Sequence, residues 1–290
     1  MATYFANLMS GSSGNASLLD AGGRGMLVDF GAGISQLKTA FSKIGATWDN
    51  IETALLTHTH TDHWRESALN EFDRRGMTLW CHESHANSFI RIGPAFSKMR
   101  KAKRVEFYEP GETFEASGCR ITPFELSHDA PTFGFRIVGK NGTIGYASDL
   151  GSWPDALVDH LLDIDLLALE FNHDVELEKA SSRPAELIER VLGDRGHLSN
   201  EQAGRLLEEV VRRSAPDRLR HVVQLHLSKE CNRPQLAAAA AEMVRESVLG
   251  DFEIHTASPT KPTPWLRLGG SRKTAAVAMS QPSLPGWSDS

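Results

Sequence analysis

Three histidines and an aspartate follow one short apolar segment, and their spacing suits metal binding. Residues 51–56 are apolar and β-prone, and they lead directly into His58, His60, Asp62 and His63. Neutral imidazole and ionised carboxylate are the usual protein ligands of Zn²⁺ and similar first-row ions. The rings of His58 and His60 could reach one ion from the same side of a tight loop. Asp62 and His63 would then point to a neighbouring position, which suggests a second ion.

Other imidazole and carboxylate side chains occur where further predicted strands end. They are His128 after 119–127, Asp149 after 142–147 and His226 after 220–225. Asp149 taken alone is more typical of a surface turn. Because the strand ends of one sheet lie along one edge, all of these residues could converge with the histidine loop. The sequence therefore predicts a polar site at the edge of a sheet.

Two segments that precede the histidine loop could support it. Asp29 ends the strand predicted over 26–29, where it could bond a ligand imidazole or fix the loop backbone from outside the ligand set. Residues 10–15 read Ser-Gly-Ser-Ser-Gly-Asn, a composition that allows a tight turn with exposed N–H groups. Such a turn could meet a phosphate through Ser12 and Asn15, although a simple hairpin loop fits this stretch equally well.

Basic residues gather between 91 and 104, with no acidic residue among them. Such a run is usually a solvated face, but beside a cleft it could contact phosphates. Lys98 and Arg100 are the candidates for this contact. Lys229, in the loop that follows His226, is a further candidate.

The order of predicted elements indicates a mixed α and β protein. Strands are expected over 3–8, 16–20, 26–29, 51–56, 77–81, 104–108, 112–117, 119–127, 133–139, 142–147, 164–170, 220–225, 252–256 and 264–268. Helices are expected over 34–45, 65–75, 82–90, 153–162, 184–192, 200–213 and 234–249. Residues 1–268 are predicted to form one domain, and the polar, aperiodic segment 269–290 is predicted to be a disordered tail.

Composition excludes several classes of protein. The chain has 290 residues, of which 40% are hydrophobic and 23% charged, as in ordinary globular proteins. No apolar run is long enough to span a membrane, and no signal peptide is apparent at the start. Three widely spaced cysteines fit a reducing, cytoplasmic environment without disulfides. The net charge of −6 argues against a surface coated with nucleic-acid-binding charge, although a local basic patch fits.

The motifs together resemble those of the metallo-β-lactamase superfamily. HTHTDH at 58–63 matches the HxHxDH signature of that superfamily, and His128, Asp149 and His226 follow in the same order. The resemblance implies an α/β (α+β) fold, namely a four-layer αβ/βα sandwich with two mixed β-sheets. It also implies the metal roles. His58, His60 and His128 would bind one ion, while Asp62, His63 and His226 would bind the other, with Asp149 bridging.

Longer strings are similar to the WalJ/YycJ-type branch of this superfamily. They are SGSSGNA at 10–16, EFNHD at 170–174, RGHLSNEQA at 195–203 and HLSKECNRP at 226–234. Members of the branch are described as DNA exonucleases or as uncharacterised metal-dependent hydrolases. The chain departs from the branch at Phe171, where Ser is typical, and at Cys231, where Asn is frequent. The resemblance makes His173 and His197 candidates for contacting phosphate or protonating the leaving oxygen; a structural or helix-capping role is the alternative for each.

These features predict a metal-dependent phosphodiester hydrolase, with DNA exonuclease activity as the leading hypothesis. Two divalent ions, Zn²⁺ or Mn²⁺ with Fe²⁺ also possible, would hold the attacking hydroxide, and Asp62, His173 and His197 are the catalytic candidates. The segment between Asp149 and His226 is too short for the extra domain of β-CASP nucleases. A small-molecule phosphodiesterase, thioesterase or lactonase is the alternative, and a non-catalytic scaffold is a third. The native metal, the cleavage polarity and the oligomeric state stay open.

Overall fold

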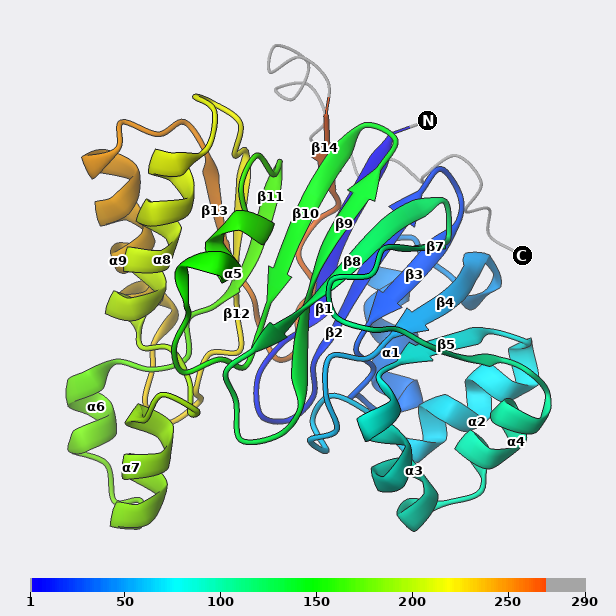
Figure 1. The fold of residues 1–290 in the computed structure, drawn as a ribbon. Helices are drawn as coiled ribbons and strands as arrows, with labels where there is room; N and C mark the ends of the chain where they lie inside the picture. Colours follow the sequence, from blue (N-terminus) through cyan, green and yellow to red (C-terminus); the bar gives the residue numbers. More distant parts are fainter. Residues whose placement is uncertain (1, 270–290) are drawn as a thin grey trace.

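Two β-sheets face each other and helices cover their outer faces (Figure 1). The structure is a computed structural model that describes residues 2–269. This arrangement confirms the predicted four-layer αβ/βα sandwich. Residues 270–290, nearly all of the segment predicted to be a tail, lie outside the described residues, so that prediction and the domain boundary at 268 remain predictions.

The first sheet joins an antiparallel half to a parallel half. Its order is β14 (Leu266–Leu268), β1 (Thr3–Met9), β2 (Ala16–Ala21), β3 (Gly25–Val28), β4 (Ile51–Leu55), β5 (Thr78–Cys81) and β6 (Val105–Phe107). Neighbours from β14 to β3 are antiparallel, whereas those from β3 to β6 are parallel. The carboxyl ends of the parallel strands therefore share one edge, where the histidine loop follows β4.

The second sheet repeats this mixture. Its order is β13 (Glu253–Thr256), β12 (His221–Leu225), β11 (Leu166–Glu170), β10 (Gly142–Ala147), β9 (Thr132–Gly139), β8 (Cys119–Leu126) and β7 (Phe114–Ala116). Strands β10 to β13 are parallel, and β7 to β10 are antiparallel neighbours. Because β8 and β10 run in the same direction, the loops after β8, β10, β11 and β12 all open at one edge.

Helices form the outer layers. On the first sheet lie α1 (Ile34–Lys43), α2 (Glu66–Arg75), α3 (Ala86–Ile92) and α4 (Ala95–Lys101); on the second lie α5 (Asp155–His160), α8 (Asn200–Arg213) and α9 (Pro234–Ser247). The short helices α6 (Val175–Lys179) and α7 (Ala185–Leu192) project beyond the second sheet at the lower left of Figure 1. The predicted helix 82–90 is divided into a 3-10 turn and α3, and α4 and α6 were not predicted from the sequence.

Three apolar cores hold the layers together. Leu37, Phe41, Phe72 and similar residues fill the space between the first sheet and its helices. Leu169, Leu206, Val222 and others do the same for the second sheet. A third core, which includes Phe135, Ile144 and Val223, lies between the two sheets. No helix within residues 2–269 has the length and apolar character needed to cross a membrane.

Helix α8 shows how local sequence sets an element that the site needs. Ser199 caps its first turn, because the Ser199 hydroxyl accepts from the Gln202 N–H at 3.2 Å and the Gln202 side chain accepts from the Ser199 N–H at 2.9 Å. These two bonds form a reciprocal capping box. Leu206, Leu207 and Val210 then bury one face against the second sheet. The Ser199 cap, two residues after His197, fixes the start of α8.

A buried histidine outside the predicted ligand set gives a stability prediction. His85 is 1% exposed and donates from Nε2 to the Pro131 carbonyl at 3.1 Å. Burial lowers the pKa of His85 to about 4. Because the unfolded chain binds this proton more readily, the stabilisation is complete above pH 6.5 and is lost as pH falls towards 4.

The His85→Gln variant keeps an N–H donor for Pro131 but cannot titrate. Urea unfolding should show that the wild type loses about 2 kcal/mol more than this variant between pH 7 and pH 5. Equal losses in the two proteins would contradict the assigned pKa.

Candidate metal centre

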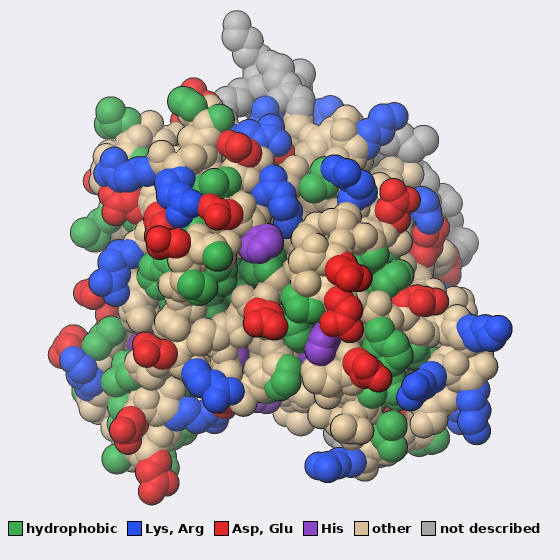
Figure 2. All heavy atoms as spheres, viewed as in Figure 1, with side chains coloured by type: hydrophobic (Ala, Val, Ile, Leu, Met, Phe, Trp, Pro, Cys, Tyr) green, Lys and Arg blue, Asp and Glu red, His purple; other side chains and the backbone are tan. Residues whose placement is uncertain are grey.

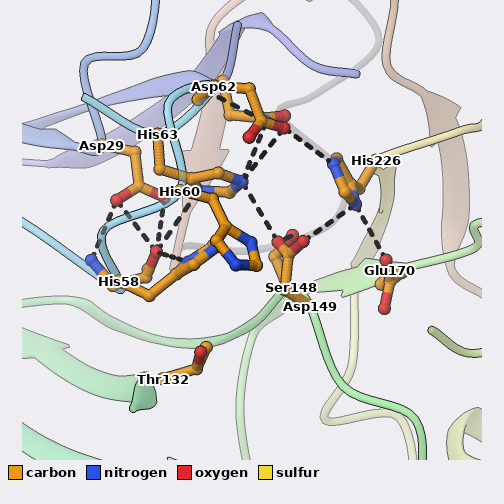
Figure 3. Close-up of polar contacts among 12 residues, drawn as sticks. Asp29, His58, His60, Asp62, His63, Thr132, Ser148, Asp149, Glu170 and His226 are labelled. Carbon is orange, nitrogen blue, oxygen red and sulfur yellow. Dashed lines mark hydrogen bonds and ion pairs between the residues drawn. The ribbon is translucent and has the colours of Figure 1, made fainter. Parts of the chain in front are cut away.

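The seven side chains predicted as metal ligands lie together at the strand ends. Figure 3 labels all of them except His128. Ligand atoms of His58, His60 and His128 all lie within 4.8 Å of one another. Those of Asp62, His63 and His226 form a second group by the same measure. The strands therefore bring together residues that are far apart in sequence, in the two groups that the resemblance implied.

Asp149 lies between the two groups. Its Oδ2 is 3.2 Å from His63 Nε2, and its Oδ1 is 3.1 Å from His226 Nδ1. It also belongs to a close group with His58 and His63. Figure 3 shows this carboxylate between His63 and His226, with Asp62 on the other side of both rings. This close group links Asp149 to His58 in the first set of ligand atoms and to His63 in the second.

Three residues of the cluster have a positive φ, a backbone conformation that residues other than glycine rarely adopt. Asp29, Asp149 and His226 have φ values of 60°, 67° and 55°. Asp29 and His226 directly follow β3 and β12, and Asp149 is the second residue after β10. Such a strained conformation is kept only when surrounding contacts stabilise it, and it is frequent at functional sites. Here Ser148 Oγ donates to Asp149 Oδ2 at 2.8 Å, and the His226 N–H donates to Ser10 Oγ at 2.8 Å.

The loop that carries His58, His60, Asp62 and His63 packs tightly against Gly31. A Cβ at Gly31 would lie only 1.7 Å from the Asp62 carbonyl oxygen, so no other residue fits there. The Asp62 carbonyl accepts from the backbone N–H of Asn15 at 2.7 Å. Arg65 Nε donates to the Gly31 carbonyl at 2.7 Å. These contacts fix the loop before any ligand binds.

Most ligand imidazoles have their outer nitrogen held by a hydrogen bond. The pairs are His58 Nδ1 with Thr57 Oγ1 at 3.0 Å, His63 Nδ1 with Asp29 Oδ2 at 2.7 Å, His128 Nδ1 with the Gly196 carbonyl at 3.0 Å and His226 Nδ1 with Glu170 Oε1 at 2.9 Å. Such bonds orient the ring and leave the Nε2 lone pair for a metal. His58 Nε2 is buried and has no hydrogen-bond partner among the described residues. A metal ion would satisfy this nitrogen, so the donor set fits divalent ions.

Negative charge concentrates around His63. Burial by itself would lower the pKa of His63, but Asp149, Asp29 and Asp62 raise it to about 9. Burial raises the pKa of Asp62, and the hydrogen bond from His226 overcomes this effect and holds it below its usual value. A buried group of carboxylates of this kind is satisfied by protons or by cations, so metal binding here would release protons.

Glu170 is a site residue that the sequence analysis missed. It is fully buried at the end of β11, and its Oε1 accepts from His226 Nδ1 at 2.9 Å and from His197 Nδ1 at 2.7 Å. Burial raises the pKa of Glu170, but His197 and His226 outweigh burial and lower it. The available signal was a carboxylate at the end of a nearly all-apolar strand, the same signal that identified Asp149.

His197 lies beside both ligand groups. Its ring centroid is 5.1 Å from that of His128 and 5.2 Å from that of His226. Its side chain is 15% exposed, so it can meet solvent or a substrate. Burial lowers the pKa of His197, but Glu170 outweighs burial and raises it. His197 also forms a close group of possible ligand atoms with Asp149, Glu170 and His226.

His173 differs from the expectation that it contacts substrate. It is 0% exposed, and neither ring nitrogen has a hydrogen-bond partner among the described residues. Its backbone pairs with Ser199 in an isolated bridge and accepts from the Asn200 N–H at 2.8 Å. This backbone pairing ties the residue to the start of α8, and the imidazole is closed off from solvent.

Asn15 also differs from its expected role. It is 2% exposed, and its Nδ2 donates to Asp62 Oδ2 at 3.2 Å. Its Oδ1 accepts from Ser10 Oγ at 2.9 Å. Asn15 therefore positions a ligand carboxylate, and it is not free to bind a phosphate. Ser12, in the same turn, is exposed, so its predicted substrate contact remains a prediction.

The basic candidates are exposed but dispersed. Lys98 and Arg100 lie on the outer helix α4, and Lys229 lies in the loop after His226. Arg104, at the end of the basic run, is engaged in structure, because its Nη1 donates to the Asp73 carbonyl at 2.6 Å. Figure 2 shows Lys and Arg intermixed with Asp and Glu on this face, with a hollow at the lower edge between the lobes that carry α6–α7 and α3.

Comparisons with known proteins agree with this architecture. A family model described as a beta-lactamase superfamily domain matches residues 24–216. The exodeoxyribonuclease WalJ of Streptococcus pneumoniae is 29% identical over 90% of this chain and 96% of its own length. The exodeoxyribonuclease YycJ of Bacillus anthracis is 26% identical over 91% and 98%. The crystal structure of YhfI from Bacillus subtilis, a metallo-beta-lactamase fold protein, superposes with a TM-score of 0.65 at 16% identity over 90% and 99%.

Proposed function

Because this chain belongs to the beta-lactamase superfamily, with the metallo-β-lactamase fold, we propose that it is a metal-dependent phosphodiesterase that degrades DNA from an end. The observation that carries the proposal is the pair of neighbouring ligand groups, with Asp149 in a close group with His58 of one and His63 of the other. The names of the curated relatives, both exodeoxyribonucleases, favour DNA as the substrate.

The chain's own residues would prepare the site for two divalent ions. His58, His60 and His128 would hold one ion and Asp62, His63 and His226 the other, with Asp149 common to both. When bound, such ions lower the pKa of water and stabilise the negative charge on a phosphate undergoing attack. Zn²⁺ and Mn²⁺ both suit this set of nitrogen and oxygen donors, and Fe²⁺ also fits.

His197 is the residue placed to protonate the departing oxygen. Glu170 holds its Nδ1 at 2.7 Å, which leaves Nε2 to face a substrate. A histidine held by a carboxylate in this way keeps one tautomer and one orientation. Its partial exposure distinguishes it from His173, which is closed off. We therefore assign general acid catalysis to His197 and leave His173 out of the reaction.

Lys98 and Arg100, which are exposed on α4, would hold the DNA backbone. Replacing both by alanine should weaken DNA binding and reduce the slope of log affinity against log salt by about 1.4–1.8, since each lost phosphate contact removes about 0.7–0.9. The measurement is binding of a catalytically inactive chain to labelled DNA at several salt concentrations.

A matched control for this pair replaces Lys38 and Arg120, an exposed lysine and arginine on α1 and β8. It removes the same charge from other parts of the surface. If both double variants gave the same salt slope, Lys98 and Arg100 would not be the residues that contact the backbone.

A hydrolase of small phosphodiesters, thioesters or lactones is the second candidate, because the net charge of −6 does not favour a polyanion. One preparation assayed on end-labelled duplex DNA, bis-p-nitrophenyl phosphate and a thioester separates the two. We expect Mn²⁺- or Zn²⁺-dependent release of nucleotides from DNA, and no release by the His60→Ala variant purified in the same way. Thioester turnover without DNA cleavage would overturn the proposal. The complete ligand set disfavours a non-catalytic scaffold.

A further inference from the structure

A second cluster of possible metal ligands lies away from the site described above. It consists of His221, Glu253 and His255, whose ligand atoms lie within 4.8 Å of one another. His221 is the first residue of β12, whereas His226 follows the last. The strand separates them by about 16 Å, because β-strands rise about 3.3 Å per residue. The two sites are therefore independent.

The parallel pairing of β12 and β13 brings these three side chains together. His221 is paired with Glu253, and Val223 is paired with His255. Glu253 and His255 are two residues apart, so their side chains leave the same face of β13. Val223 belongs to the core between the sheets, which places the cluster on the inner face at the open edge of the second sheet.

The distances between the ligand atoms fit one face of a tetrahedron. His221 Nδ1 is 3.3 Å from His255 Nε2 and 3.6 Å from Glu253 Oε2, and His255 Nε2 is 3.5 Å from Glu253 Oε2. A tetrahedral Zn²⁺ with bonds of 2.0–2.2 Å requires ligands about 3.3–3.6 Å apart. All three edges thus match, and the fourth position is left for water.

The burial and hydrogen bonding of these side chains favour a preformed metal site over an accidental cluster of surface residues. The side chains of His221 and His255 are only 13% and 17% exposed, so packing limits their rotamers. The His221 ring also hydrogen-bonds to the backbone of Arg267 in β14, the edge strand of the other sheet. Such a bond is how proteins orient a metal-binding imidazole. The charge of Arg220, which acts on His221, is offset by Asp165 at 3.8 Å.

We propose that His221, Glu253 and His255 form an additional binding site for a first-row divalent cation such as Zn²⁺, Co²⁺ or Ni²⁺. Two imidazoles and one carboxylate select such ions over Mg²⁺ and Ca²⁺, which require oxygen ligands. The ion ties β13 to β12. Since β13 has only four residues and pairs on one side only, this bond stabilises an exposed sheet edge.

The test is a count of bound Zn²⁺ on the untagged full chain after equilibrium dialysis at micromolar free Zn²⁺. The His255→Ala and Glu253→Gln variants should each hold about one ion fewer than the wild type. Zn²⁺ should also raise the Tm of the wild type by about 5 °C more than that of either variant. Mg²⁺ should produce no such difference. Glu253 is exposed, so its replacement by glutamine leaves the fold intact.

His82→Ala is the matched control. His82 has one carboxylate neighbour, Glu109 at 3.4 Å, but belongs to no three-ligand group among the described residues. This variant should keep the wild-type ion count. DNA cleavage should be unchanged in all three variants, which separates this site from the proposed catalytic function. Equal ion counts and equal Tm shifts in the wild type, His255→Ala and Glu253→Gln would overturn the proposal.

Discussion

The Asp149→Ala variant should lose about 10³-fold or more in kcat on phosphodiester substrates, because it removes the carboxylate that we propose as the common ligand of both ions. Asp149 is 1% exposed and contacts His63 and His226 at 3.2 and 3.1 Å. Without Asp149, the two proposed ions would lose their common ligand. The imidazoles of His63 and His226 would lose a neighbouring negative charge. The bound metal should therefore fall together with kcat.

The measurement combines kcat on labelled DNA with metal content for the same sample. Circular dichroism checks that the variant is folded, since removing a buried carboxylate also perturbs stability. A histidine variant outside both clusters, His82→Ala, should keep full activity and metal content. If Asp149→Ala retained wild-type kcat, or lost kcat while holding all its metal with an intact fold, Asp149 would not be the shared ligand.

The His197→Ala variant should lose about 10²–10⁴-fold in kcat on DNA but only a few-fold on bis-p-nitrophenyl phosphate. The departing oxygen of a nucleotide needs a proton, whereas p-nitrophenolate leaves readily without one. The substrate dependence separates proton donation from a merely structural role, because misfolding or loss of a metal ligand would reduce both activities alike.

Two further variants test whether the effect is specific to His197. Glu170→Gln should reproduce part of the His197→Ala effect, about 10–100-fold, since it weakens the bond that orients the ring. His173→Gln should have little effect on either substrate, because His173 is fully buried. A His197→Ala loss of equal size on both substrates would assign His197 to metal binding, and a large loss in His173→Gln would restore His173 to the reaction.

The sequence could predict which side chains converge, because each one is marked by a local signal. The end of a strand is marked in the sequence by a change from apolar to polar residues. Each predicted ligand follows such a change, as His128 and Asp149 do. Strand ends of a mixed sheet meet at one edge, so convergence followed once the elements were correct.

The errors concern tertiary contacts that no local pattern carries. Glu170 resembled the last polar residue of a strand, and only its two bonds to His197 and His226 reveal its role. Asn15 was expected in a phosphate-binding turn, yet the fold places it against Asp62. His173 was expected in the site because of the family motif around it. Its backbone pairing with Ser199, which links two loops distant in sequence, closes it off.

Crystals of the chain grown with Mn²⁺ and measured at the manganese absorption edge test the central claim most directly. The account predicts two anomalous peaks about 3.5–4 Å apart, one within bonding distance of His58, His60 and His128 and the other of Asp62, His63 and His226, with Asp149 touching both. Anomalous density that is absent from this cluster, or located only elsewhere on the molecule, would contradict it.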